Sequence, residues 1–199
     1  MAIQQVRNIA PFIGKVFTVT SQWWTVRTNP VTGVIEIHRG LDIRTQGGNN
    51  EPIYSMLSGV VNDKGYTSTA GNYIIIADNN PLSSTYGYAT RFLHMKDPSP
   101  LSVGDPVSVG QEVGLEGDTG EATGVHLHIE MQDISRFNWS WHASHTKSDY
   151  LDPTVFMGID NIRLTQWIYN GRPPWHPSIK RFPWYLITDK LKKRRILTK

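Results

Sequence analysis

The sequence contains no cysteine among its 199 residues, and this absence removes two kinds of chemistry. No disulfide can form within the chain, and no thiolate can bind a metal ion. Any metal site must therefore use imidazole nitrogen and oxygen ligands. The absence leaves the cellular compartment open.

Two kinds of targeting segment are also missing. No apolar run is long enough to cross a membrane as a helix, so we expect no transmembrane segment. Residues 1–10 include Gln4, Gln5, Arg7 and Asn8 and lack the apolar centre of a secretory signal. We therefore expect either that a signal has been removed or that the protein leaves its cell by lysis or on a virus particle.

Acidic residues are scarce near the C-terminus, which makes the charge uneven. Residues 1–158 carry 10 Lys and Arg against 15 Asp and Glu, a net charge of −5. Residues 159–199 carry 10 Lys and Arg against 2 Asp, a net charge of +8, together with six aromatic residues: Trp167, Tyr169, Trp175, Phe182, Trp184 and Tyr185. This basic, aromatic-rich extension favours a polyanionic partner such as an anionic cell-wall polymer. The alternatives are a solvated basic end and aromatic residues that pack the extension onto its own domain.

Nucleic acid is a further polyanion, suggested by a pI of about 9.1. The acidic balance of residues 1–158 restricts such binding to the extension, and no recognised nucleic-acid motif is present. We expect no nucleic-acid partner.

Short β-strands are predicted through the body of the chain. Runs of β-branched and aromatic residues occupy residues 53–61, 72–77, 86–93 and 125–131, with turn residues between them. The pattern is typical of a mainly β protein with a small antiparallel sheet.

The domain is predicted to end near residues 150–153. The sequence then divides into an N-terminal lead-in over residues 1–16, one domain over residues 17–158, and the extension over residues 159–199.

Four of the seven histidines lie in three short segments that suit one metal site. His126 and His128 are two residues apart on a predicted strand, so both side chains face the same side. His38 and Asp42 are four residues apart, on either side of a glycine that favours a turn. His94 follows a predicted strand, and an imidazole there can move protons near neutral pH.

These five residues offer enough ligands for a catalytic zinc, which commonly takes three protein ligands and keeps one position for water. Their spacing leaves open which three bind and what the others do. We assign no metal role to the remaining histidines, His142, His145 and His176.

The segments resemble the M23 (lysostaphin- and LytM-type) zinc peptidases, which cut peptidoglycan cross-links. His38-x-x-x-Asp42 is similar to the first ligand pair of that family, and His126-x-His128 lies in the last matching segment. The resemblance extends over roughly residues 17–156. Further matching segments follow in the family's order: residues 53–61, 71–76, 88–94, 103–107, 110–114 and 117–120.

The resemblance implies a fold, a cofactor and a site. The fold is a small antiparallel β-sheet domain with a groove, and the cofactor is zinc. By the resemblance, His38, Asp42 and His128 are the zinc ligands, and His94 and His126 are the catalytic histidines. The substrate implied is a peptide of bacterial peptidoglycan, so the protein would act outside the cell, facing the cell wall, or on a virion.

The sequence departs from the family pattern at one position. Some members carry a tyrosine shortly before the first ligand, at a position associated with stabilising the oxyanion. Residues 32–37 contain no tyrosine, so that role falls to a histidine or to another residue. Nearby, Trp23 and Trp24 are predicted either to line the substrate groove or to pack inside the domain.

Two alternatives to an enzyme follow from the same sequence. One is a non-catalytic module of this fold that binds the cell wall, although all five expected positions are filled. The other is a structural part of a larger polypeptide or assembly, such as a phage tail tip. The extension, which the resemblance does not cover, keeps this second alternative open.

Overall fold

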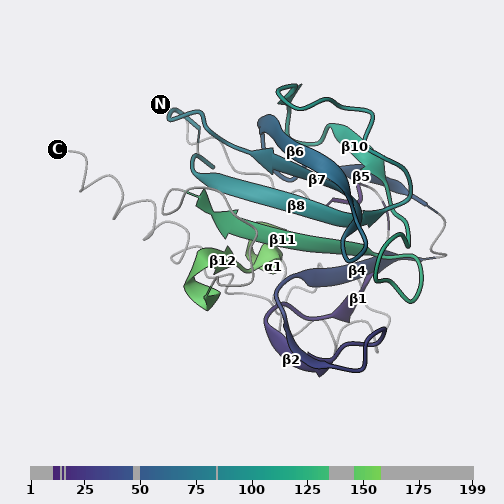
Figure 1. Cartoon of the computed structure of the whole chain (residues 1–199). Coiled ribbons are helices and arrows are strands. Elements are labelled where there is room, and N and C mark those ends of the chain that lie inside the picture. Colours follow the sequence, from purple (N-terminus) through teal and green to yellow (C-terminus); the bar gives the residue numbers. More distant parts are fainter. Residues whose placement is uncertain are drawn as a thin grey trace, which may run out of the picture. The chain divides into compact units, whose positions relative to one another are not determined.

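An antiparallel sheet of eight strands forms the framework of the described part of the chain (Figure 1). The computed structural model describes residues 11–13, 15, 17–46, 50–83, 85–134 and 146–157. Seven strands follow the order β1-β4-β11-β8-β7-β6-β9, and β12 pairs with β11 outside this path. Their bounds are β1 Phe17–Ser21, β4 Leu41–Thr45, β6 Gly59–Thr67, β7 Gly71–Ala77, β8 Tyr88–Met95, β9 Pro106–Val107, β11 Leu127–Asp133 and β12 Tyr150–Leu151. The prediction of a mainly β, antiparallel fold is confirmed.

Two smaller sheets accompany the large one. β5 (Pro52–Tyr54) pairs with β10 (Glu112–Leu115), and β2 (Thr25–Thr28) pairs with β3 (Ile35–His38). Two short helices, η2 (Lys147–Asp149) and α1 (Pro153–Phe156), flank β12. In the described ranges, no helix is long and apolar enough to span a membrane.

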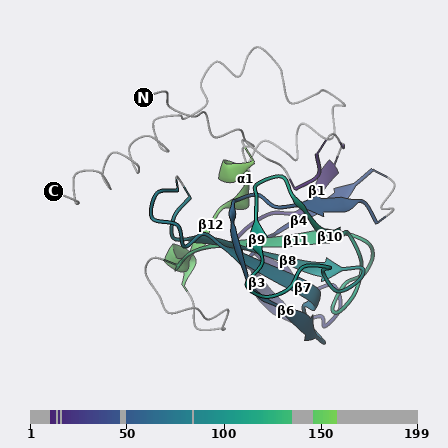
Figure 2. The same cartoon turned by 90° about the horizontal axis from the view of Figure 1, so that it is seen from above.

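The two central strands divide their side chains between the core and the site. Figure 2 shows β11 between β4 and β8. In β11, Leu127, Ile129 and Met131 belong to the hydrophobic core, whereas the alternate positions hold His128 and Glu130. β4 repeats this pattern, because Leu41 and Ile43 enter the core on either side of Asp42. Since successive side chains of a strand point to opposite faces, one face of the sheet forms the core and the other carries the metal-binding residue types.

The strand predictions are confirmed over 72–77, 86–93 and 125–131, which correspond to β7, β8 and β11 with small shifts at the ends. The prediction of one strand over residues 53–61 is wrong. The chain bends between β5 and β6, and β6 continues through residues 62–65, which read as a turn. The reason is tertiary pairing: a bulge after Val61 lets β6 stay in register with β7 through these turn-type residues.

The C-terminal end of the described sheet is marked by a helix cap. The Asp152 carboxylate accepts a hydrogen bond from the Thr154 backbone N–H at 3.0 Å, and Pro153 occupies the first position of α1. Residues 1–10 and 158–199 lie outside the described residues. The domain boundaries at residues 16 and 158 stay predictions.

Candidate metal centre

Three side chains from three strands meet on the polar face of the sheet. His38 is the last residue of β3, Asp42 lies in β4, and His128 lies in β11. Asp42 and His128 are directly opposite each other in the β4–β11 register. A two-residue turn, Arg39-Gly40, joins β3 to β4 and brings His38 back beside Asp42. The predicted turn between these two residues is therefore present, and the segment is not helical.

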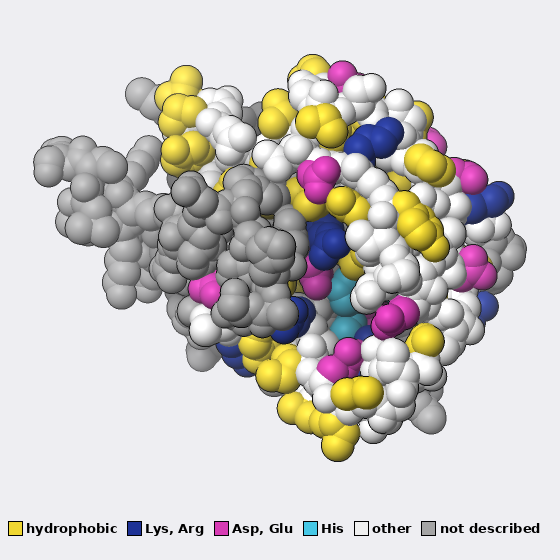
Figure 3. All heavy atoms as spheres, in the orientation of Figure 1, with side chains coloured by type: hydrophobic (Ala, Val, Ile, Leu, Met, Phe, Trp, Pro, Cys, Tyr) yellow, Lys and Arg dark blue, Asp and Glu magenta, His cyan; other side chains and the backbone are white. Residues whose placement is uncertain are grey.

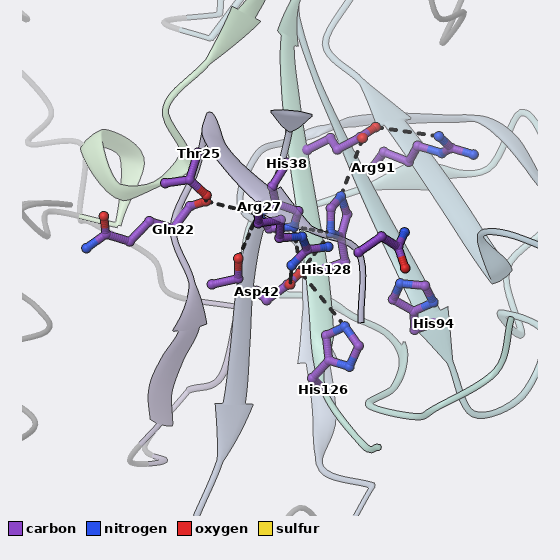
Figure 4. Close-up of polar contacts among 12 residues, drawn as sticks. Gln22, Thr25, Arg27, His38, Asp42, Arg91, His94, His126 and His128 are labelled. Atoms are coloured by element: carbon purple, nitrogen blue, oxygen red, sulfur yellow. Dashed lines mark hydrogen bonds and ion pairs between the residues drawn. The ribbon is translucent and has the colours of Figure 1, made fainter. Parts of the chain in front are cut away.

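The donor atoms of this triad, His38, Asp42 and His128, converge on one point (Figure 4). His38 Nε2 lies 3.1 Å from Asp42 Oδ1 and 3.0 Å from His128 Nδ1. His128 Nδ1 lies 2.7 Å from the same Asp42 oxygen. All three side chains are buried, with at most 8% of each residue exposed. Two imidazole nitrogens and one carboxylate oxygen in this arrangement could hold a metal ion.

Gly40 is required by the close packing at this turn. A Cβ atom at this position would lie 2.3 Å from His128 Nε2 and 2.6 Å from the Ile129 carbonyl oxygen. Only glycine leaves the space that the His128 ring occupies.

Both histidines of the triad are also held from outside the cluster. His38 Nδ1 donates to the Gln22 carbonyl oxygen at 2.9 Å, which leaves Nε2 as the unprotonated nitrogen of the neutral ring. His128 Nε2 lies 3.4 Å from the Glu130 carboxylate, which leaves Nδ1 toward the cluster. Partners of this kind fix the orientation and tautomer of metal-binding histidines.

The charges of the triad are strongly coupled. Although burial would raise the pKa of Asp42, the hydrogen bonds and charge of His128 and His38 hold it well below its usual value. Burial alone would lower the pKa of His128, but the carboxylates of Asp42 and Glu130 raise it to about 9. The pKa of His38 is lowered, chiefly by burial. Without a metal ion, the triad therefore holds a proton on His128 at neutral pH.

His94 reaches the same face of the sheet through an irregularity in β8. Strict alternation would place it on the side of Phe92, a core residue that pairs with Ile129 of β11. In the pairing of β7 with β8, however, Leu93 and His94 together oppose the single residue Tyr73, and His94 has a φ of +60°. A bulge of this kind redirects a side chain, and histidine tolerates the left-handed conformation better than most residues.

His126 approaches from the segment that precedes β11. It forms an isolated bridge with Gly117, and its Nε2 lies 3.8 Å from Asp42 Oδ1. The ring centres of His94 and His126 are 4.8 Å apart. The structure thus brings all five predicted residues together, while their individual roles stay predictions.

The two histidines outside the triad open on a cavity of about 240 Å³. Figure 3 shows histidine side chains at the floor of a hollow in this face of the molecule, with basic and acidic side chains around them. The cavity is also lined by Arg27 and Arg44 and by residues 121–126. It corresponds to the predicted groove.

His94 and His126 are oriented by backbone carbonyl groups. His94 Nδ1 donates to the Thr119 carbonyl oxygen and His126 Nδ1 to the Gly124 carbonyl oxygen, each at 2.8 Å. A carbonyl oxygen can only accept, so each neutral ring keeps Nε2 free of a proton. Burial lowers the pKa of His94, and the charges of His128 and His126 lower it further, to about 4. At neutral pH His94 can therefore accept a proton.

Sequence reasoning missed two charged residues at the site. Arg27 Nη1 donates to Asp42 Oδ2 at 2.8 Å, and Glu130 contacts both His128 and Arg91. Glu130 had a signal, since it continues the two-residue period of His126 and His128 on one strand face. Arg27 had none, because nothing in its spacing connects β2 to Asp42.

Trp23 and Trp24 were predicted either to line the groove or to pack, and both pack against other side chains. Trp23 packs against the hydrophobic core, and Trp24 lies against Trp23 and Tyr150 at ring-centre distances of 5.8 and 5.5 Å. Three histidines without a predicted metal role, His142, His145 and His176, lie outside the described residues.

Comparison with known proteins shows which sequences and structures this chain is similar to. The chain is 38% identical over 112 residues to the peptidoglycan DD-endopeptidase ShyC of Vibrio cholerae. The matched stretch covers 56% of this chain and 24% of ShyC. A solved zinc-containing peptidase from Vibrio cholerae matches with a TM-score of 0.52 and 29% identity, over 72% of this chain and 37% of that chain.

The catalytic domain of lysostaphin from Staphylococcus simulans shares the fold. Its TM-score is 0.53 at 22% identity, over 72% of this chain and 92% of that domain. The chain itself spans only about a quarter of the length of ShyC.

The family assignment rests on a longer stretch than the five site residues. Residues 36–143, more than half of the chain, match peptidase family M23, and this stretch contains the whole triad, His94 and His126. The chain belongs to peptidase family M23.

Proposed function

We propose that the protein is a zinc-dependent endopeptidase that hydrolyses peptide cross-links of bacterial peptidoglycan. The observation that carries this proposal is the meeting of a buried His-Asp-His triad with two carbonyl-oriented histidines at one cavity. A purely structural or wall-binding module of this fold would not need all five residues, nor histidine rings whose tautomers are fixed by hydrogen-bond partners. The family membership and the similarity to ShyC support the same activity.

The triad fits zinc by its donor chemistry. His38 Nε2, Asp42 Oδ1 and His128 Nδ1 would be the ligand atoms, because the outer nitrogens of both rings are engaged by Gln22 and Glu130. Two imidazoles and one carboxylate form one of the common catalytic zinc sets, which keeps a position for water. When bound, zinc supplies Lewis acidity and lowers the pKa of a bound water to about 7.

The two remaining histidines supply proton transfer. Each ring donates through Nδ1, so Nε2 is the unprotonated nitrogen when the ring is neutral, and the low pKa of His94 keeps its ring neutral at pH 7. One ring takes the proton of the attacking water, and a histidine then returns a proton to the leaving amine. The carbonyl oxygens of Thr119 and Gly124 keep a proton on Nδ1 of each ring, so proton exchange takes place at Nε2.

For the bond that is cut, we propose a link between two D-configured residues of directly cross-linked stem peptides. The support is the 38% identity to a DD-endopeptidase. The likeness to lysostaphin concerns the fold and does not bear on the bond.

The test is mass spectrometry of soluble fragments after the protein is incubated with peptidoglycan sacculi, with and without a zinc chelator. We expect new peptide amines at D,D cross-links, and these should disappear with the chelator. Absence of release from several wall types by protein with measured bound zinc would favour a binding or structural role instead.

We further propose that residues 159–199 bind an anionic cell-wall polymer, on the strength of their net charge of +8. Replacing the run Lys190, Lys192, Lys193, Arg194 and Arg195 by glutamine should weaken binding to walls. The loss should be larger at low salt, where electrostatic attraction is least screened. Cleavage of a small soluble peptide should be unaffected. Equal wall binding by the wild type and the glutamine variant would contradict a role of residues 159–199 in polymer binding.

Action on the cell wall implies a place outside the cytoplasmic membrane. Carriage on a virion, or inclusion in a larger polypeptide, stays a prediction.

A further inference from the structure

The β2–β3 hairpin turns its polar residues toward the metal centre and its apolar residues outward. Arg27 and Glu36 lie on the same face as His38, whereas Val26 and Ile35 on the other face are 73% and 74% exposed. Exposing branched apolar side chains forgoes the stabilisation that their burial would bring. The hairpin therefore places a charged pair beside the site at the expense of its own packing.

Arg27 is held in place by two carboxylates. Its Nε–H donates to Glu36 Oε1 at 3.1 Å, and its Nη1–H donates to Asp42 Oδ2 at 2.8 Å. Glu36 lies directly opposite Arg27 in the hairpin register, and Asn29 donates to the second Glu36 oxygen at 3.1 Å. Charge-assisted hydrogen bonds of this geometry fix a guanidinium before any substrate arrives.

Part of the guanidinium remains for another acceptor. Arginine has five N–H donors, and these two contacts use Nε and Nη1. Nη2 makes no hydrogen bond to any residue in the ranges that the structure describes. Arg27 lines the same cavity as His94 and His126, and 26% of its side chain is exposed. A fixed positive donor thus borders the space that contains both candidate proton-transfer groups (Figure 4).

We propose that Arg27 donates a hydrogen bond to the carbonyl oxygen of the scissile peptide and stabilises the negative charge that develops there. This inference rests on the proposed endopeptidase function. In the first step the water oxygen bonds to the carbonyl carbon, a histidine takes the water proton, and the carbonyl π electrons move onto the oxygen. In the second step the C–N bond breaks, the C=O π bond re-forms, and a histidine passes the proton taken from water to the leaving amine.

The contact with Asp42 suggests a simpler role that must be separated from this one. Arg27 would then only orient the carboxylate, so that Oδ1 is left for the metal. Loss of Arg27 would in that case act through zinc binding. Loss of an oxyanion donor instead lowers kcat by about 10²–10³-fold while the metal stays bound.

The experiment compares Arg27→Gln with Arg44→Gln in the full chain. Arg44 lines the same cavity and makes no hydrogen bond or ion pair with Asp42, so its loss removes the same charge without removing a hydrogen bond to the triad. The measurements are kcat and KM on a soluble cross-linked peptide, zinc content by mass spectrometry, and the affinity for a phosphinic peptide that mimics the tetrahedral intermediate. A further variant, Arg27→Lys, keeps the charge but lacks the forked donors, and it serves if Arg27→Gln does not fold.

For Arg27→Gln we expect kcat to fall about 10²–10³-fold with KM nearly unchanged, full zinc content, and phosphinate affinity weakened by a similar factor. Arg27→Lys should lose at least about tenfold in kcat with zinc retained, and Arg44→Gln should lose less than about tenfold. Parallel loss of zinc and kcat in both Arg27 variants would show a positioning role and overturn the proposal, as would a kcat within threefold of wild type. Wild-type protein that binds zinc but cleaves no peptide would refute the proposed function, and this inference with it.

Discussion

The metal triad and the pair of histidines beside it use the same side chain in opposite ways. In the triad, His128 is flanked by the carboxylates of Asp42 and Glu130, which raise its pKa to about 9. In the pair, burial and the charges of His128 and His126 lower the pKa of His94 to about 4, although its hydrogen bond to the Thr119 carbonyl acts in the opposite direction. The surroundings of each ring, through burial and neighbouring charges, decide which protonation state it adopts.

This difference suits the two parts of the site to different work. A histidine between carboxylates is a strong donor toward a cation, since the negative charge that favours a proton also favours a metal ion. A histidine that burial keeps neutral is available as a base. The division predicts that substitutions in the two parts have different signatures, and the tests below are ordered by expected effect.

The largest effect is expected for Asp42→Ala. Asp42 contacts both triad histidines and Arg27, so its loss leaves two imidazoles and an Arg27 guanidinium that is paired with Glu36 alone. We expect zinc content near zero and peptidase activity at background, measured by metal analysis and by fragment release from sacculi. Asp97→Ala, which removes an exposed carboxylate, should keep both. Stoichiometric zinc in Asp42→Ala would show that the ligand set is wrong.

The next largest effect is expected for substitutions of His94 and His126, which should differ from triad substitutions by leaving zinc bound. His126→Ala and His94→Ala should keep bound zinc but lose about 10²–10⁴-fold in turnover, the usual contribution of general acid–base catalysis. Zinc content and kcat should be measured on the same preparations, with His128→Ala as the comparison that loses metal. If His126→Ala loses zinc while His128→Ala retains it, the roles of these two histidines are reversed.

Most residues of the site could be predicted because they carry local signals. His126 and His128 show the strand period, and a glycine between His38 and Asp42 indicates the turn that joins their strands. The resemblance to a family then separated ligands from catalytic residues. The sheet was predictable for the same reason, because runs such as residues 72–77 are apolar and are bounded by turn residues.

The placement of His94 and Arg27 could not be predicted from local pattern. A strand period puts His94 on the core side, and only the bulge opposite Tyr73 returns it to the site. Arg27 meets Asp42 because the β2–β3 hairpin folds over the sheet, and such a contact depends on tertiary structure. Arg27 is the candidate for the oxyanion-stabilising role that the sequence alone left unassigned.

A smaller effect is expected from weakening the outer support of the triad. Glu130→Gln removes the negative charge beside His128 Nε2 without changing the size of the side chain. Loss of such a partner typically lowers metal affinity about 10–100-fold, and we expect this range in competition with a zinc chelator. Glu112→Gln, at an exposed position, is the matched control and should bind zinc like the wild type. Unchanged affinity in Glu130→Gln would show that Glu130 does not support the ligand.

The last test replaces no residue and follows a pH dependence that links the two parts. The pKa of His128 in the folded, metal-free protein is about 9, above its ordinary value of 6.5. Its contribution to the stability of that form is fully present below pH 6.5 and is lost as the pH rises toward 9. Zinc must displace the same proton, so between pH 6.5 and 9 zinc affinity should rise by up to about tenfold per pH unit. The zinc-induced increase in Tm should therefore grow across this window, because the metal-free form loses stability while zinc binding strengthens.

In Glu130→Gln one of the two carboxylates that raise the pKa of His128 is gone, so the dependence should level off at a lower pH. An increase in Tm that is the same at pH 6.5 and pH 9 would mean that His128 carries no proton in the metal-free protein, and the contrast between the two sets of histidines would then not hold.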